Sequence, residues 1–138
     1  MNVEKVYPKV REIIADVLVI DEDDISLDSR LIADLNAESI DFLDLVFQLE
    51  KEFAIKIPRG QLEKNARGEL AEDEFEQKGQ LTEQGMRALK AYLSEVPESH
   101  FKDNMKVNEI PMLFNVETFC KLVVSAVNAK QNASEAVN

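Results

Sequence analysis

Apolar residues recur at helical spacing in three parts of the chain, and each part predicts an amphipathic helix. The first part repeats at Val3, Val6, Val10, Ile13, Ile14 and Val17. The second is expected to run from about Ser39 to Phe53, and the third from about Asn115. The third repeats at Val116, Phe119, Cys120, Val123 and Val127, before a polar tail, residues 130–138, that is expected to fray. No strand period, internal repeat or glycine-rich phosphate loop is present. The pattern therefore predicts an all-α, up-and-down bundle of four or five helices in one domain, residues 1–138.

The central helix carries two apolar arcs rather than one. The broader arc, expected to face the core, contains Phe42, Leu45, Val46, Leu49 and Phe53. A narrower arc of Ile40, Leu43 and Phe47 begins beside Ser39. The remaining positions are polar or acidic, at Asp41, Asp44, Gln48 and Glu52, with Glu50 between the arcs. From these residues alone, a serine-capped core helix with a solvated acidic face is the simpler interpretation.

An insertion of about residues 59–109 separates the central helix from the last one. Its first part, Gln61 to Gln80, is highly charged with few apolar residues, which predicts short helical turns and mobile loops. A helix is then expected to start with Thr82 as its cap and Glu83 in its first turn. The apolar residues of the insertion are too few to predict an independent core.

The composition narrows the classes of function. Acidic residues outnumber basic ones 27 to 16, and the formal net charge is −11. A nucleic-acid-binding protein needs a basic surface, so this charge argues against that class. It favours basic protein partners, which an acidic surface attracts over a distance.

The sequence gives little support for a disulfide or for a metal site. Cys120 is the sole cysteine, so an intramolecular disulfide is excluded and no cysteine-based metal site is indicated. The acidic run Asp21–Asp24 does not fit an EF-hand, because Ser26 and Ile32 fall where that loop needs glycine and glutamate. The first twenty residues lack the apolar block of a signal peptide, and no run is long enough to span a membrane. We expect a soluble, cytoplasmic monomer without a metal.

The centre of the chain resembles the acyl carrier protein family. The resemblance lies in Asp34-Leu35-Asn36-Ala37-Glu38-Ser39-Ile40-Asp41 and, after an apolar helix, in Glu50-Lys51-Glu52-Phe53-Ala54-Ile55-Lys56-Ile57-Pro58. The family usually has Asp-Leu-Gly, then Asp-Ser-Leu, then an acidic helix that closes on Glu-Glu-Phe and Ile-Pro. Here Glu38 replaces the aspartate, Ile40 the leucine and Asn36 the glycine. Asparagine tolerates the left-handed backbone that a glycine supplies. The resemblance implies an acyl-carrier-like helical bundle with an added helical insertion.

The resemblance also implies a cofactor. Ser39 would carry covalent 4'-phosphopantetheine, attached by a phosphopantetheinyl transferase, and acyl groups would be held on it as thioesters. Physically, a phosphodiester at a helix N-terminus meets unpaired N–H groups and the positive end of the helix dipole. Glu38 and Asp41 flank the serine, and Glu38 would help the transferase hold its metal ion. On this interpretation the protein is a substrate of enzymes and performs no catalysis itself.

Two further sets of residues follow from the resemblance. The surface recognised by partner enzymes would consist of Ile40, Leu43, Asp44, Phe47 and Glu50, together with Asp41. Partners would be the transferase, acyl-ACP synthases or ketosynthases, and acyltransferases with basic docking surfaces. The cleft that shelters the fatty acyl chain would be lined by Leu45, Val46, Leu49 and Phe53. Plain core packing explains this last set equally well.

The residues from Ser39 to Phe47 and from Lys51 to Pro58 also resemble a specialised branch of this family. These larger carriers deliver very-long-chain hydroxylated fatty acids to lipid A in some Gram-negative bacteria, and they carry a charged extension after the Ile-Pro pair. We expect delivery to fatty acid or lipid A biosynthetic enzymes. The insertion would enlarge or cover the acyl cleft, or select a dedicated acyltransferase.

Three alternatives remain open. The carrier could move amino-acyl or polyketide intermediates, or the chain could be an unmodified interaction module of the same fold, which Glu38 supports best. An enzyme comes last, because the one histidine, His100, forms no convincing Ser-His-Asp arrangement and Ser39 lacks a Gly-x-Ser-x-Gly elbow.

Overall fold

The structure is a computed structural model that describes the backbone of residues 2–58 and 60–137. Side chains are described over the same ranges, except those of Ser39 and residues 131–137. The chain forms two compact units: the first is Met1–Pro58 with Asn115–Asn138, and the second is Arg59–Phe114. The description of residues 1–138 as one domain with an insertion stays a prediction.

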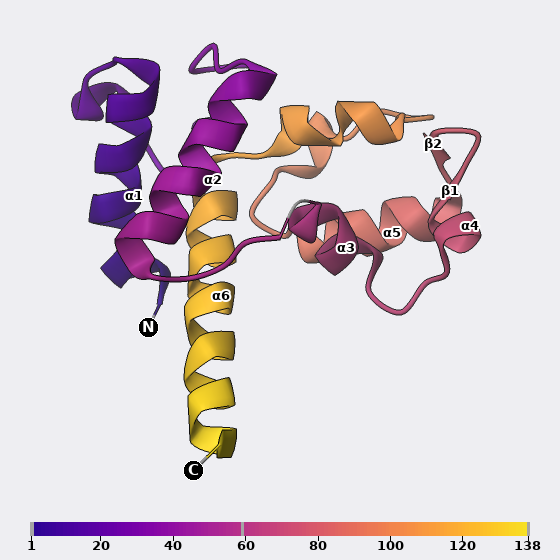
Figure 1. The fold of residues 1–138 in the computed structure, drawn as a ribbon. Helices are drawn as coiled ribbons and strands as arrows, with labels where there is room; N and C mark the ends of the chain where they lie inside the picture. The colour runs from indigo at the N-terminus through magenta and orange to yellow at the C-terminus, as the bar shows by residue number, and fades with distance from the viewer. Residues whose placement is uncertain (1, 59, 138) are drawn as a thin grey trace. The chain divides into compact units, whose positions relative to one another are not determined.

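The first unit is built from three α-helices that contact one another pairwise (Figure 1). They are α1 (Val3–Leu18), α2 (Ser39–Phe53) and α6 (Val116–Val137), with a short 3-10 helix at Glu22–Asp24. Their fully buried residues include Val6, Val10, Ile14, Leu49, Phe119 and Val123. The rings of Phe42 and Phe119 stack at 5.8 Å between centroids. The helices predicted from apolar spacing, including the bounds of α2, are confirmed.

The start of α6 is fastened to the loop before α2. Its first backbone N–H groups donate to that loop, Val116 to the Ser29 carbonyl at 3.0 Å and Glu117 to the Leu27 carbonyl at 2.9 Å. Asn115 and Thr118 are joined by two reciprocal hydrogen bonds. The Asn115 backbone N–H donates to the Thr118 hydroxyl, and the Thr118 backbone N–H donates to the Asn115 side-chain oxygen. The N-terminal donors of a helix need such acceptors when they are buried. Fraying of residues 130–138 stays a prediction, although α6 is helical to Val137.

The second unit contains shorter elements. They are α3 (Gln61–Arg67), α4 (Glu72–Phe75), β1 (Glu76–Gln77), β2 (Gln80–Leu81), α5 (Glu83–Tyr92) and 3-10 helices at Glu98–His100 and Val107–Leu113. The two strands pair antiparallel across a turn in which Lys78 and Gly79 both have positive φ. This turn is the kind that suits a two-residue hairpin. The predicted cap of α5 is confirmed, because the Thr82 hydroxyl accepts from the Gly85 N–H at 2.9 Å.

The expectation that the insertion lacks a core was wrong. Its buried apolar residues are Ala66, Phe75, Leu81, Leu89, Leu93, Val96, Met105, Ile110, Leu113 and Phe114. Several of them lie in irregular segments, which have no period to reveal burial. The second compact unit extends to Phe114. Gly85 allows α5 to pack close to Phe75, since a Cβ there would lie 2.0 Å from the Phe75 carbonyl oxygen. Taken over both units the described chain is mainly helical, which confirms the fold class.

Candidate functional site

A compact loop delivers the chain to the start of α2. Its backbone is tied by hydrogen bonds from the Asp34 N–H to the Arg30 carbonyl and from the Ala37 N–H to the Leu31 carbonyl. Ala37 is buried and anchors the end of the loop. Asn36 has φ 61°, the left-handed backbone expected where the family has glycine. The loop therefore reverses the chain one residue before Ala37 and leaves Glu38 and Ser39 at the helix start.

The first turn of α2 is capped by Asp41 rather than by Glu38. The Asp41 Oδ2 atom accepts from the Glu38 backbone N–H at 2.8 Å. This half-buried carboxylate thus has a structural task, while Glu38 is exposed. Ser39 is the first residue of α2, and its side chain lies outside the described residues. The roles of Glu38, Ser39 and Asp41 toward a cofactor stay predictions.

An apolar strip lies on the surface of α2. Ile40, Leu43 and Phe47 are 69%, 58% and 61% exposed, and Asp44 beside them is exposed as well. Three large apolar side chains in one row are costly to leave in water unless something covers them for part of the time. We call these three residues the α2 strip. Its role in binding partners stays a prediction.

Glu50 has a contact that the sequence did not reveal. It is half-buried, and its Oε2 atom accepts from the Ile57 backbone N–H at 2.7 Å. This bond folds the segment after α2 back onto the helix, where Ile55 and Ile57 are buried. The spacing of residues gives no signal for this bond, because it joins two residues seven positions apart across the end of the helix. Partner binding by Glu50 stays a prediction.

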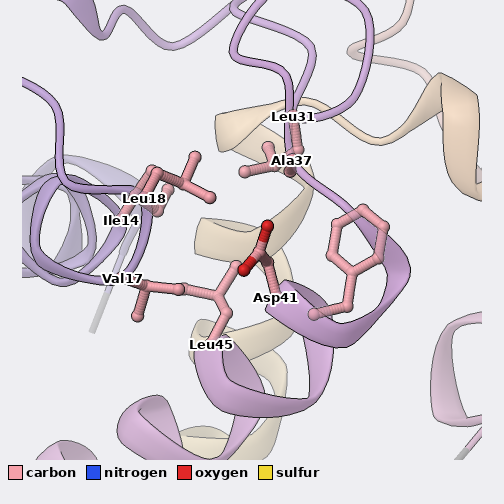
Figure 2. A pocket seen from close by; sticks show the side chains of 8 residues that line it. Ile14, Val17, Leu18, Leu31, Ala37, Asp41 and Leu45 are labelled. Carbon is pink, nitrogen blue, oxygen red and sulfur yellow. The ribbon is translucent and has the colours of Figure 1, made fainter.

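A narrow pocket lies beside the start of α2 (Figure 2). It is lined by Ile14, Val17 and Leu18 of α1, Leu31 and Ala37 of the loop, and Asp41, Phe42 and Leu45 of α2, and we call it the α1–α2 pocket. The space between these side chains does not admit a water molecule. Of the four residues predicted to line an acyl cleft, Leu45 lines this pocket. Leu49 is fully buried elsewhere, and Val46 and Phe53 are half-buried. The walls from α1 and the loop were missed, because periodicity within one helix does not identify its neighbours.

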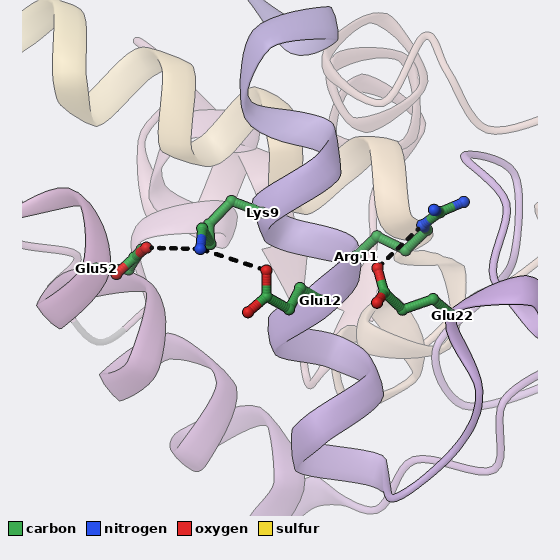
Figure 3. A network of polar contacts seen from close by, with 5 residues as sticks. All are labelled: Lys9, Arg11, Glu12, Glu22 and Glu52. Atoms are coloured by element: carbon green, nitrogen blue, oxygen red, sulfur yellow. Dashed lines mark hydrogen bonds and ion pairs between the residues drawn. The ribbon is translucent and has the colours of Figure 1, made fainter.

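Surface ion pairs hold α1 to its neighbours (Figure 3). The Lys9 Nζ atom lies 3.2 Å from Glu52 of α2 and 3.3 Å from Glu12. Lys9 donates hydrogen bonds to Glu52 and to Glu12, and both bonds raise the pKa of its ammonium group, the bond to Glu52 more strongly. Arg11 pairs with Glu22 of the following 3-10 helix at 3.5 Å. Exposed pairs such as these add little stability.

Other candidate groups lie apart from this site. His100 is half-buried in the second unit, and Cys120 is fully buried in α6. Within residues 2–58 and 60–137, no cluster of three or more His, Cys, Asp or Glu side chains could hold a metal ion. None of the helices described has both the length and the apolar character to cross a membrane.

Comparison with known proteins identifies the class. The sequence profile of the phosphopantetheine attachment site matches residues 8–72, which include the loop, α2 and Ser39. The acyl carrier protein of Petrotoga mobilis is 41% identical over 64 residues, which are 46% of this chain and 75% of that protein. The acyl carrier protein of Thermotoga maritima is 41% identical over 61 residues, 44% of this chain and 75% of that protein. Acyl carrier protein AcpXL of Rhizobium meliloti is 48% identical over 58 residues, 42% of this chain and 61% of that protein.

The chain therefore belongs to the acyl carrier protein family. Its function is to carry acyl groups, and its cofactor is 4'-phosphopantetheine. The amino-acyl, polyketide and unmodified-module alternatives are not favoured by these matches. The start of α2 suits the cofactor, since Glu38 and Ile40 on either side of Ser39 are exposed and leave this turn open to a modifying enzyme.

Proposed function

We propose that Ser39 carries the phosphopantetheine arm. The matched segment contains two other serines, Ser26 and Ser29, and their hydroxyls are engaged with each other at 3.0 Å. Ser29 also accepts from the Ser26 N–H, and Ser26 donates to Asp28 at 2.6 Å. Ser39 differs from both because it begins a long helix, where unpaired N–H groups and the helix dipole favour a phosphodiester. This position at the N-terminus of α2 is the observation that carries the proposal.

The chain's own residues prepare this turn. Asp41 occupies the Glu38 N–H, which fixes where the helix begins. The exposed carboxylate of Glu38 is free to approach a metal ion held by the transferase, with one more methylene of reach than the usual aspartate. When bound, the arm supplies a terminal thiol that holds acyl groups as thioesters. The protein performs no catalysis itself.

The α2 strip is the proposed docking surface for partner enzymes. Its apolar residues would be covered during docking, and Asp44 beside them would meet basic side chains. Its small area suits transient encounters, so we propose a monomer that visits its enzymes in turn. These would be the transferase, acyl-ACP synthases or ketosynthases, and acyltransferases in the cytoplasm.

The cargo is proposed to be fatty acyl groups for fatty acid or lipid A biosynthesis. Two relatives named acyl carrier protein AcpXL, from Rhizobium meliloti and Mesorhizobium japonicum, are 48% and 52% identical over their matched regions. The residues from Ser39 to Phe47 and from Lys51 to Pro58 resemble the branch of larger carriers that serves very-long-chain fatty acids, which supports this cargo. The second unit would adapt this carrier to its own acyl chain or acyltransferase.

Intact-mass spectrometry tests the attachment site. Wild type, Ser39→Ala and the matched control Ser29→Ala are each incubated with coenzyme A and a phosphopantetheinyl transferase. We expect wild type and Ser29→Ala to gain one phosphopantetheine and Ser39→Ala to gain none. A gain on Ser39→Ala would place the arm elsewhere. No gain on wild type with several transferases would favour an unmodified interaction module.

A further inference from the structure

The α1–α2 pocket is closed, and one of its walls must move before an acyl chain can occupy it. Its three walls are the last turn of α1, the loop from Leu31 to Ala37, and the first turns of α2 (Figure 2). Its lining is apolar apart from Asp41. This apolar lining suits a hydrocarbon chain, but the lack of room for even a water molecule excludes one from the closed form.

Two of these walls are firmly tied. The loop is held by backbone bonds to the Arg30, Leu31 and Ile32 carbonyls, and the Asp34 carboxylate also accepts from the Arg30 N–H at 2.8 Å. The start of α2 is held by the Asp41 cap and by the stacking of Phe42 on Phe119 of α6. Moving either wall would break several of these interactions together.

The last turn of α1 has a strained end instead. Val19 has φ 56° and ψ 54°, a left-handed backbone that is strongly disfavoured for a β-branched residue. Its side chain is 88% exposed, so packing of that side chain does not compensate for the strain. The N–H groups of Val19 and Ile20 both donate to the Ala15 carbonyl. After this turn, Glu22 pairs with Arg11 at 3.5 Å, and the Ile25 carbonyl accepts from the Tyr7 hydroxyl at 3.3 Å.

We propose that the last turn of α1 is the movable wall of the pocket and that Val19 is its hinge. Relaxation of Val19 to extended backbone breaks the bonds from the Val19 and Ile20 N–H groups to the Ala15 carbonyl. Without these bonds the last turn unwinds from its end and moves Val17 and Leu18 away from the pocket, which then admits the acyl chain. The release of strain at Val19 offsets part of the cost of opening. This proposal rests on the proposed carrier function, because it concerns how the attached chain is sheltered.

A glycine substitution tests whether Val19 acts as a hinge or only ends the helix. Val19→Gly removes the strain of the closed form, so that opening no longer releases it. The matched control is Ala54→Gly, because Ala54 ends α2 with the same left-handed backbone, φ 53° and ψ 48°, and does not line the pocket. Both variants should melt a few degrees above wild type in the unacylated form. Each protein is then loaded with octanoyl-phosphopantetheine from octanoyl-coenzyme A by a transferase, and loading is verified by intact mass.

Cleavage of the octanoyl thioester by hydroxylamine measures shelter of the chain. We expect cleavage several-fold faster in Val19→Gly than in wild type, and unchanged in Ala54→Gly. Hydrogen exchange in wild type should show that octanoylation removes protection at Val19 and Ile20 and preserves it from Asp34 to Ala37. Equal cleavage rates in all three proteins, or lost protection in the loop instead of α1, would overturn the hinge and leave the carrier function intact. Failure of the mass to increase would instead count against the carrier function itself.

Discussion

Cys120 is the residue whose chemistry the fold changes most. It is fully buried on α6, and burial, followed by the charge of Glu117, raises the pKa of its thiol to about 12, from an ordinary value of 9.0. The folded chain therefore keeps the proton after the unfolded chain has released it. Stability from this difference is fully present below pH 9 and is lost as the pH rises toward 12.

Cys120→Ala should remove this part of the pH dependence. Between about pH 8 and about pH 10, the free energy of unfolding of wild type should fall by about 1.4 kcal/mol more than that of Cys120→Ala. Urea unfolding at each pH measures the difference. Because only the change with pH is compared, the constant cost of the cavity left by alanine cancels. Equal slopes in the two proteins would show that the thiol ionises normally in the folded state.

A second prediction at the scale of the residue concerns the backbone of Asn36. Its left-handed backbone, φ 61°, costs little for asparagine and nothing for glycine, but it is unfavourable for alanine. We expect Asn36→Ala to lower the free energy of unfolding by about 1 kcal/mol. Asn36→Gly should be near neutral. Urea unfolding curves of the two variants check this, and equal stabilities would argue against a left-handed residue at this point of the loop.

At the scale of the element, the end of α2 depends on Glu50. Its carboxylate accepts from the Ile57 N–H in a half-buried position, and a hydrogen bond to a charged group contributes about 1.5–3 kcal/mol. Glu50→Ala should lower the free energy of unfolding by that amount. Asp44→Ala is the matched control, since Asp44 is an exposed acid on the same helix, and it should change stability by less than about 0.5 kcal/mol. Similar losses in both would mean that helix charge, not this bond, stabilises the element.

Substitutions in the α2 strip should weaken the binding of partner enzymes and leave the stability of the fold unchanged. Leu43→Ala is expected to lower kcat/KM of the transferase at least about fivefold, the effect of losing roughly 1 kcal/mol of docking energy. Its melting temperature should stay near that of wild type because Leu43 is 58% exposed. Met112→Ala, which shortens another exposed apolar side chain, should change neither quantity. Equal transferase kinetics in both variants would remove the docking role from the strip.

Sequence patterns predicted the elements of the first unit well and those of the second unit poorly. α2 and α6 follow a clear apolar period, and the Asn36 turn followed from its place in the motif. The hairpin at Glu76–Leu81 has two residues per strand, too few to establish a strand period. Met105 and Val96 are buried in irregular backbone, where spacing carries no information. The Val19 strain and the Glu50–Ile57 bond depend on tertiary structure and have no local signature.

At the scale of the whole molecule, the proposed carrier site belongs to one unit. Ser39, the α2 strip and the α1–α2 pocket all lie in the first unit. The chain leaves the first unit after Pro58 and returns to it at Asn115, and the residues next to both junctions are held by contacts inside the first unit. Ile55 and Ile57 are buried before one junction, and α6 starts on the Leu27 and Ser29 carbonyls after the other. The first unit should therefore keep its site without the second.

Replacing residues 59–114 with a flexible linker tests this separation. We expect the shortened protein to unfold cooperatively and to gain one phosphopantetheine on Ser39, as we expect of the unshortened chain. Loading both proteins with acyl chains of increasing length, and assaying transfer by candidate acyltransferases, then isolates what the second unit adds. If that unit tunes the carrier to a long chain or a dedicated acyltransferase, the shortened protein will lose that preference while modification of Ser39 continues. Unchanged length preference and partner choice would refute that role, whereas loss of cooperative unfolding would show that the first unit needs the second to fold.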